Sequence, residues 1–281
     1  MLRILSCLLL AVLPLAAQPR LTNAKLQTRS AAAGLEKEFR AIVNGAAAPA
    51  WIGYAVPATP GEHHSCCCGP DHGCTCCLEG TKAEAQTASS GPVKLEGPQR
   101  ITVLFRAEQR QVGKIRMFSE DCALDAGGLP VHWLADVQPV QSVALLASFA
   151  SGAEDRLRNS AMVAIAMHAA PEAVDALIEM ARRNPSARVR GQALFWLSQQ
   201  AGKKAAAAIG QAVSDDPDTE VKKRAVFALS QLKEDSVPLL IQVARGNSNP
   251  AVRKQAIFWL GQSKDPRALG FFEEILTGRQ R

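Results

Sequence analysis

Apolar residues recur with a helical period over the second half of this chain. Four segments carry an apolar or small residue at positions 0, +4, +7 and +8, which fall on one side of a helix with about 3.6 residues per turn. These segments begin at Leu157, Val189, Val221 and Val252. A second, shorter helix is expected after each of them, over residues 171–183, 203–213, 235–245 and 266–276. The pattern therefore predicts about four helical hairpins.

The four segments lie 32, 32 and 31 residues apart. A nearly constant interval of this size is typical of a solenoid, in which each unit cannot bury its apolar face alone and stacks on its neighbour. Proline and a capping side chain separate the units, as in Asp215-Asp-Pro217-Asp218, where they stop one helix and start the next. We predict an α-solenoid over residues 139–281. Trp196 and Trp259, both at position +7, are expected to be largely buried in it.

These repeats resemble the HEAT family, in particular the short HEAT-like repeats first recognised in phycobilisome lyases. The likeness rests on a basic residue one place after each leading residue, and it covers residues 155–281 only. It implies that each basic residue pairs with an acid in the preceding turn, which Asp155 and Asp218 supply in two units, whereas Ser186 and Asn249 stand in the other two. The basic residues are Arg158, Arg190, Lys222 and Arg253. Lyase-like activity would follow from likeness of fold alone, so no enzyme is predicted.

Residues 18–138 are predicted to form a small α+β domain. Its first residues, 18–32, are polar, and we expect an irregular lead-in there. A helix is expected over residues 33–43, because their apolar residues share one face. Gly45 is expected to end this helix in a left-handed conformation.

The rest of this domain contains runs of strand-forming residues. Residues 49–57 are expected to be an extended segment packed on the domain core. Residues 100–106 and 112–118 are rich in strand formers and are separated by the polar residues Glu108–Gln111, which is typical of a β-hairpin.

The beginning of the chain has the pattern of a secretory signal peptide. A positive start is followed by about a dozen apolar residues, Ile4–Leu15, and by a small-residue exit at Ala16-Ala17-Gln18. The apolar run is shorter than the roughly 20 residues needed to span a bilayer. We therefore expect residues 1–17 to be removed and the mature protein to be secreted or periplasmic, without stable membrane insertion. The segments Trp51–Tyr54 and Asp121–Gly128 also resemble a group of secreted bacterial proteins of unknown role.

The loop over residues 62–80 holds the densest group of potential ligands in the sequence. Thiolate and imidazole are ligands that zinc and copper ions prefer, and Gly69-Pro70 would turn the loop so that they converge. Outside the cytosol, however, thiols tend to form disulfides, and the spacing matches no zinc-finger pattern. Metal binding, disulfides and an insert without function all stay open. The candidate metal ligands are His63, His64, Cys66, Cys67, Cys68, His72, Cys74, Cys76 and Cys77.

Cysteine number alone does not decide between these alternatives. The chain has 8 cysteines, and Cys7 would leave with the signal peptide. The odd number that remains would leave one cysteine unpaired if only disulfides form.

No motif in the chain points to catalysis. It lacks a phosphate-binding glycine loop, a serine-hydrolase elbow and a His-Glu-x-x-His zinc motif. A nucleophilic Cys122 beside His132 can be imagined, but a secreted cysteine beside a turn is more often disulfide-bonded or packed. His168 is expected to cap or pack at the end of a repeat helix. The formal charge of +6 is spread along the repeats, so nucleic-acid binding is not predicted.

Two functions follow from these features. The first is a secreted or periplasmic scaffold that holds a protein partner on the solenoid surface. The second is a protein that binds or handles zinc or copper through the cysteine- and histidine-rich loop. At the C-terminal end, Phe271 and Phe272 either pack inward against Ile257 and Leu260, or one of them points outward and favours a partner or a second copy of the chain.

Overall fold

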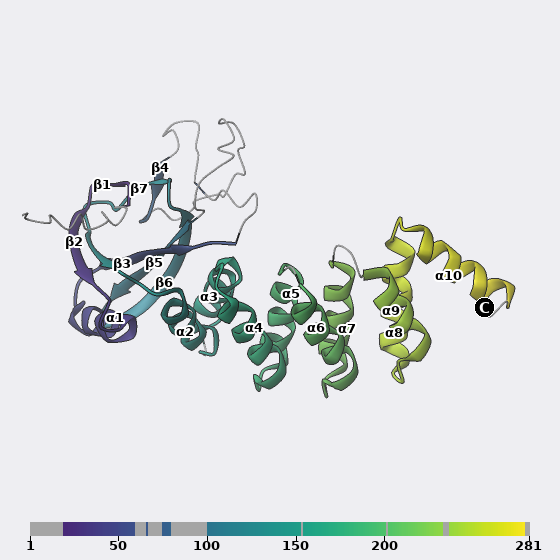
Figure 1. Cartoon of the computed structure of the whole chain (residues 1–281). Coiled ribbons are helices and arrows are strands. Elements are labelled where there is room, and N and C mark those ends of the chain that lie inside the picture. Colours follow the sequence, from purple (N-terminus) through teal and green to yellow (C-terminus); the bar gives the residue numbers. More distant parts are fainter. Residues whose placement is uncertain are drawn as a thin grey trace, which may run out of the picture.

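The computed structural model shows a β-rich N-terminal domain followed by a row of helices (Figure 1). The structure describes residues 19–59, 66, 75–79, 100–152, 154–200, 202–232 and 236–278. The predicted signal peptide and most of the loop over residues 62–80 lie outside these described residues.

The N-terminal domain contains two β-sheets. The larger has the strand order β2-β8-β3-β5-β6, and the smaller has the order β1-β7-β4. Strands β2, β8 and β3 run parallel to one another, whereas β3, β5 and β6 are antiparallel. The strands in the described residues are β1 (Leu21–Thr22), β2 (Lys25–Ser30), β3 (Ala50–Pro57), β4 (Thr75–Cys77), β5 (Arg100–Glu108), β6 (Gln111–Ser119), β7 (Ala123–Asp125) and β8 (Pro130–Ala135).

The predicted β-hairpin is confirmed as β5 and β6. Only Gln109 and Arg110 connect the two strands, and both have positive φ, 52° and 61°. A two-residue hairpin turn needs such values because its twist must match that of the strands. The extended segment expected over residues 49–57 is β3, which lies in the middle of the larger sheet. Its residues are buried on both faces, so its sequence is apolar without alternation.

The expectation of an irregular lead-in at residues 18–32 is wrong, because β2 pairs with β8 at the edge of the larger sheet. Every residue of β2 is exposed. The strand therefore lacks the alternation of apolar and polar residues by which a half-buried strand is recognised. Its backbone pairing with β8, which is distant in sequence, is what makes it a strand.

The helix expected over residues 33–43 is α1 (Leu35–Gly45). Its predicted left-handed end is wrong. Gly45 has no positive φ, and the following Ala46 has φ −81° and donates its N–H to the carbonyl of Val43 at 3.1 Å. The last turn thus closes on a backbone bond and needs no left-handed residue.

Side chains cover both faces of the larger sheet. On one face, Phe39 of α1 packs edge-on against Phe105 of β5, with ring centroids 4.8 Å apart, in a core that continues into the helices. On the other face, Trp51 belongs to a second core together with Cys76 and Leu124 of the small sheet. The small sheet therefore covers the second core.

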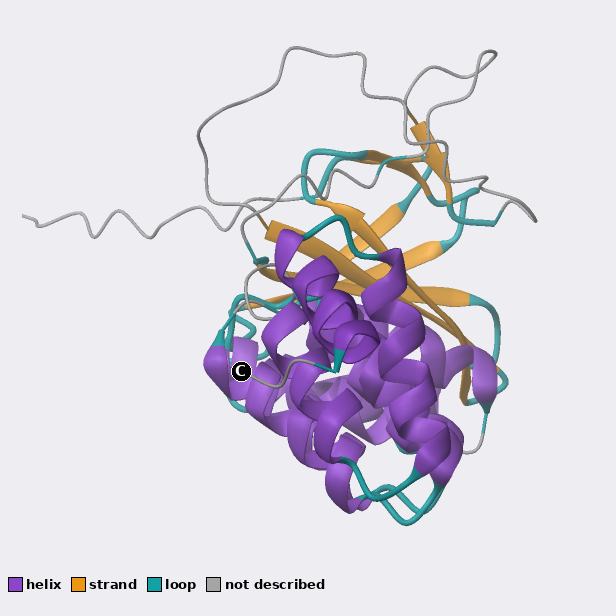
Figure 2. Ribbon diagram, turned by 90° about the vertical axis from the view of Figure 1, so that its right-hand side faces the viewer, coloured by secondary structure: helices purple, strands orange, loops and turns teal. Residues whose placement is uncertain are grey.

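The helices after the sheets stack side by side in one row, and Figure 2 shows them one behind another from the C-terminal end. We call α3, α5, α7 and α9 the A helices and the others of the row the B helices. Each A helix packs against the B helix before it, and α7 also packs against α5 and α9. The bounds are α2 (Pro139–Ala150), α3 (Asp155–Met167), α4 (Pro171–Arg183), α5 (Ala187–Ser198), α6 (Lys203–Asp215), α7 (Thr219–Ser230), α8 (Ser236–Gly246), α9 (Pro250–Gln262) and α10 (Pro266–Thr277).

Local sequence explains where these helices begin. Proline occupies the first turn of α2, α4, α9 and α10, where its missing N–H costs no hydrogen bond. The side chains of Asp218, Asn249 and Asp265 accept hydrogen bonds from N–H groups at the starts of α7, α9 and α10. Among the described residues, no helix has both the length and the apolar character needed to cross a membrane.

The predicted α-solenoid is confirmed, but the burial predicted at position +7 is wrong. Positions 0, +4 and +8 are buried, as Val189, Ala193 and Leu197 show. Trp196 and Trp259, in contrast, are only half-buried. The same position holds a buried alanine in α3 and α7, so the space there suits a methyl group, and a larger indole extends toward the surface.

The pairing of basic residues with acids that the family resemblance implied is confirmed in one of the two units that supply the acid and is wrong in the other. Arg158 does pair with Asp155, although both lie in α3. Asp218 instead accepts bonds from the N–H groups of Glu220 and Val221 as the cap of α7. What the four basic residues share is a bond to a backbone carbonyl in the preceding turn: Arg158 to Gly152, Arg190 to Asn184, Lys222 to Ser214 and Arg253 to Asn247. A carbonyl at the end of a helix lacks a partner within the helix, so a cation one turn away satisfies it.

Candidate functional site

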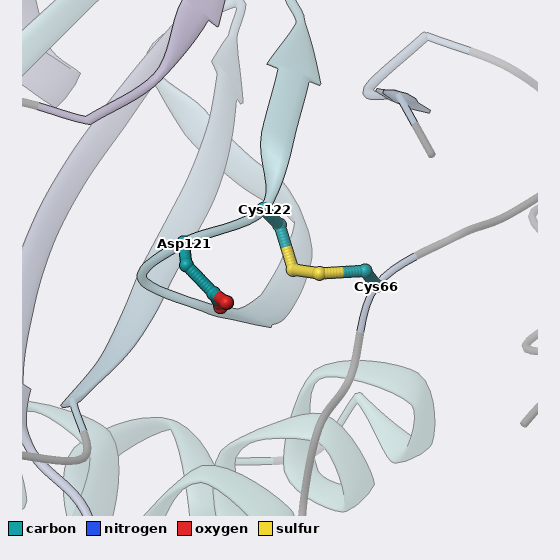
Figure 3. A group of neighbouring side chains, drawn as sticks. All are labelled: Cys66, Asp121 and Cys122. Carbon is teal, nitrogen blue, oxygen red and sulfur yellow. A yellow bond between two sulfur atoms is a disulfide. The ribbon is translucent and has the colours of Figure 1, made fainter. Parts of the chain in front are cut away.

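Cys66, a predicted metal ligand, forms a disulfide with Cys122, 56 residues later (Figure 3). Asp121 lies beside this disulfide, and its carboxylate and the two sulfur atoms all lie within 4.8 Å of one another. Cys122 follows β6, so the bond joins the predicted loop to the end of the β-hairpin. A cysteine in a disulfide offers no thiolate, which excludes Cys122 as a nucleophile in this form.

The other described cysteines of the loop are not brought to this group. Cys76 lies on β4 with its side chain buried in the second core, and the neighbouring Cys77 is exposed. The backbone of β4 is held in place, since the Cys77 carbonyl accepts a bond from Arg116 at 2.9 Å. The remaining predicted ligands lie outside the described residues: His63, His64, Cys67, Cys68, His72 and Cys74.

His132, considered with Cys122 as a nucleophile pair, lies on β8 and takes no part in the group around the disulfide. Its Nδ1 is buried without a hydrogen-bond partner among the described residues. Burial lowers the pKa of His132 below its usual range, and the charge of Arg29 lowers it further. The lowered pKa favours the neutral form of this half-buried imidazole.

Tyr54, Ser142 and His168 form a buried chain of hydrogen bonds where the larger sheet meets the helices. The Ser142 hydroxyl lies 2.8 Å from both the Tyr54 hydroxyl and Nε2 of His168, and Nδ1 of His168 lies 2.7 Å from the carbonyl oxygen of Ala164. Because a carbonyl only accepts, Nδ1 donates to it, Nε2 accepts from Ser142, and Tyr54 donates to Ser142. The expected place of His168 at a helix end is confirmed, since Ala164 belongs to the last turn of α3.

Burial keeps this chain neutral. It raises the pKa of Tyr54 well above its usual range and lowers the pKa of His168. Backbone bonds reinforce the junction, from Thr59 N–H to the Met167 carbonyl at 2.9 Å and from Ala169 N–H to the Pro57 carbonyl at 3.1 Å. The end of β3 is therefore bonded directly to the end of α3. These backbone bonds and the buried side-chain bonds hold the N-terminal domain against the row of helices.

Aromatic side chains run along the exposed side of the A helices at positions +6 and +7. The rings of Phe195 and Phe227 lie nearly parallel, with 3° between their planes and 6.3 Å between their centroids. Phe227 approaches Trp259 at 5.0 Å, and Trp259 approaches Phe258 at 5.1 Å. Phe195 and Phe258 remain 37% and 52% exposed. We call these residues, together with Trp196, the aromatic row.

A groove of about 390 Å³ lies at the start of the aromatic row, on α3, α5 and α7. A glycine inside α5 shapes it, since a Cβ at Gly191 would lie 2.5 Å from Cδ of Arg224. Glycine inside a helix costs about 1 kcal/mol relative to alanine, and here it lets the Arg224 side chain cross α5. The groove is lined by Asn159, Val163, Gly191, Gln192, Phe195, Trp196, Arg224 and Phe227.

The groove offers apolar surface, two amides and one cation, and the residues that line it include no nucleophile or carboxylate. Such a surface can bind a ligand but has no group for acid–base or covalent chemistry. The groove was not predicted from the sequence, although a signal was present. Position +6 is Phe195, Phe227 and Phe258 in three successive units, and it lies just outside the buried positions 0, +4 and +8.

Comparison with known proteins places the repeats in a family. The family model for HEAT repeats matches residues 206–280, which begin inside α6 and continue through α10. No curated protein matches the sequence.

Two solved structures are similar to this chain over about half its length. One is human deoxyhypusine hydroxylase in complex with glycerol, with 20% identity, a TM-score of 0.35, and coverage of 47% of this chain and 43% of that one. The other is the Escherichia coli protein YibA, with 22% identity, a TM-score of 0.33, and coverage of 50% of this chain and 55% of that one. The chain thus spans about half the length of each. The match of the family model, the repeat pattern and the stacked helices show that this chain contains HEAT repeats.

Proposed function

We propose that this protein is a secreted or periplasmic interaction scaffold that holds a segment of a partner protein against the aromatic row. HEAT repeats suggest such a scaffold because a row of stacked hairpins offers a long binding surface without catalytic groups. The N-terminal domain covers the first end of the row and fixes its position through the Tyr54–Ser142–His168 chain.

The observation that carries this proposal is the exposure of the aromatic row. Phe195 and Phe258 expose more than a third of their surface, whereas the leucines of the same helices, such as Leu197 and Leu260, are buried. Exposed aromatic rings are costly in water and are enriched at protein interfaces. A groove of about 390 Å³ beside them has the size of a site for a few side chains.

The compartment is supported by two features. The first residues of the sequence have the pattern of a signal peptide. The disulfide between Cys66 and Cys122 is of the kind that persists in oxidising compartments and is rare in the cytosol. Sequencing the N-terminus of the protein recovered from the periplasm or culture medium tests this part, and a chain that retains Met1 in the cytosol would contradict it.

The binding surface can be tested by photo-crosslinking in cells. A photoreactive amino acid is placed at Phe227 in one strain and at Gln242, exposed on the B helix α8, in another. We expect one partner protein to be captured from Phe227 and not from Gln242, and its capture to be lost when Phe195 is changed to Asp. Equal capture at both positions, or capture that survives F195D, would show that the aromatic row is not the binding surface.

A second candidate function is the binding of zinc or copper, and one observation favours it. Cys66, Asp121 and Cys122 place two sulfur atoms and a carboxylate within 4.8 Å of one another. Thiolates and a carboxylate suit zinc, but only when the disulfide is reduced. The test is elemental analysis of protein purified under reducing conditions, beside the variant D121N. A stoichiometric bound ion in the wild-type protein, with less ion bound to D121N, would support metal binding. If neither protein holds an ion, the disulfide is the role of these cysteines.

A further inference from the structure

Charge is distributed unequally between the two kinds of helix in the row. The A helices carry nine basic residues and two acidic ones, whereas the B helices carry six of each. The acidic residues of the A helices are Asp155 and Glu220. The A helices therefore carry seven more basic than acidic residues, while the B helices are neutral overall.

Most of the basic residues of the A helices already have partners. Arg158, Arg190, Lys222 and Arg253 bond to backbone carbonyls in the preceding turns. The two others with partners are Arg188, paired with Asp155, and Lys223, paired with Glu220.

Three basic residues make no hydrogen bond or ion pair within the described part of the chain: Arg156, Arg224 and Lys254. Arg224 and Lys254 come from α7 and α9, two successive A helices, which also carry Phe227 and Phe258. Arg224 lines the groove itself. An acidic ligand at the aromatic row could therefore form ion pairs with Arg224 and Lys254.

A second polar feature of the groove lacks a partner. The amide nitrogen of Gln192 donates to the side-chain oxygen of Asn159 at 2.9 Å, but the amide oxygen of Gln192 is buried with no hydrogen-bond donor. A buried acceptor without a donor destabilises the fold. Because this oxygen is buried, the N–H of a peptide in the groove would reach it only after the Gln192 side chain turns outward.

These features together describe the ligand. We propose that the groove holds an extended acidic segment of the partner protein, with an aliphatic or aromatic side chain against Phe195 and Phe227, and carboxylates beside Arg224 and Lys254. This inference rests on the proposed scaffold function and adds the chemistry of the bound segment. Peptide is favoured over nucleic acid because a polyphosphate track needs many available cations, and Arg224 and Lys254 are the two unpaired ones beside the aromatic row within the described residues.

The test is selection from a library of random peptides displayed on phage, with the purified mature chain as bait. We expect the enriched peptides to carry Asp or Glu next to a large apolar residue. A synthetic peptide from that set is then measured by fluorescence anisotropy against wild type, R224E, K254E and the double variant. Each single change is expected to weaken binding about tenfold, the size of one charge-assisted contact, and the double variant is expected to select basic peptides instead.

The matched control is K203E, which makes the same change of charge on the B helix α6, at an exposed lysine without an ion pair in the described residues. It should leave the affinity unchanged. Enrichment of neutral or basic peptides by wild type, equal losses with K203E, or tighter binding of a labelled oligothymidylate would overturn the inference. Capture of a partner through Phe227 by a segment without acidic residues would overturn it as well, while leaving the scaffold function in place.

Discussion

Arg190 of α5 and Asp216, the residue that follows α6, form a bidentate ion pair. Nε of Arg190 donates to one carboxylate oxygen of Asp216 at 2.7 Å and Nη2 donates to the other at 3.0 Å. Both side chains are buried, and Asp216 also accepts the N–H of Asp218. Bonds from Asp216 raise the pKa of Arg190 above its usual range. Because Arg190 also donates to the carbonyls of Asn184 and Pro185, it links the turn before α5 to the turn after α6.

Changing Asp216 to Asn should destabilise the row, because it leaves the Arg190 cation buried and incompletely paired. Removing one partner of a buried ion pair costs about 3–5 kcal/mol, and we expect about 3, since Arg190 keeps its bonds to the carbonyls of Asn184 and Pro185. Urea unfolding measures the loss. The neighbouring D215N, at an exposed position, is the control, and equal values for the two variants would show that the ion pair contributes nothing.

The junction should lose stability as pH falls. The imidazole of an unfolded histidine titrates near pH 6.5, and burial lowers the pKa of His168 in the folded protein. Below about pH 6.5 the unfolded chain binds a proton that the folded chain does not, so stability present above that pH is lost toward the lower folded pKa. H168Q should therefore show a smaller drop in unfolding free energy between pH 7.5 and pH 5 than wild type.

His132 provides the comparison for this measurement, because its pKa is also lowered by burial. H132Q should remove only its own share of the pH dependence, and the Tyr54–Ser142–His168 chain should stay intact. If H168Q kept the full wild-type slope, His168 would not be the group that titrates.

The disulfide between Cys66 and Cys122 should stabilise the N-terminal domain. It closes a loop across 56 positions of sequence, for which loss of chain entropy in the unfolded state gives roughly 4 kcal/mol. Under oxidising conditions, C122S should have the same unfolding midpoint as the wild-type protein has in reductant. C77S, at an exposed position of β4, should keep the midpoint of the oxidised wild-type protein. Peptide mapping without reduction checks the pairing, and a Cys122 peptide linked to another cysteine would contradict it.

Position +7 and position +8 of the A helices should respond differently to truncation. Leu197 is fully buried, so L197A is expected to cost about 2–5 kcal/mol through a cavity. Trp196 is half-buried, and W196A should cost about 2 kcal/mol or less while it weakens partner capture. Thermal and urea unfolding of the two variants decide the order, and a larger loss for W196A would make the tryptophan a core residue after all.

Self-association should depend on α10 and not on the phenylalanines considered from the sequence. Phe271 is buried and Phe272 is half-buried near Gly261, whereas Leu269 and Leu276 are 62% and 84% exposed. If copies of this chain associate, sedimentation should show that L269S and L276S together weaken the association without a loss of stability. F271S should instead lower the unfolding free energy. An association that L269S and L276S leave unchanged would place the contact elsewhere.

The sequence by itself determined the solenoid, since the repeats are local. A helix is recognised from apolar residues a few positions apart, and three comparable A helices make positions 0, +4 and +8 evident in Val189, Ala193 and Leu197. The hairpin of β5 and β6 was visible for the same reason, because only Gln109 and Arg110 separate its strands. Local spacing carries this information.

Contacts between distant residues were decided only by the tertiary structure. β2 is a strand because β8 lies beside it, more than a hundred positions later, and Cys66 finds Cys122 across the domain. The exposure of the aromatic row depends on the spacing between neighbouring helices. This spacing leaves room for a buried alanine methyl at position +7, whereas an indole at the same position extends to the surface. Sequence spacing describes one helix at a time, whereas the groove and its unpaired cations arise between helices.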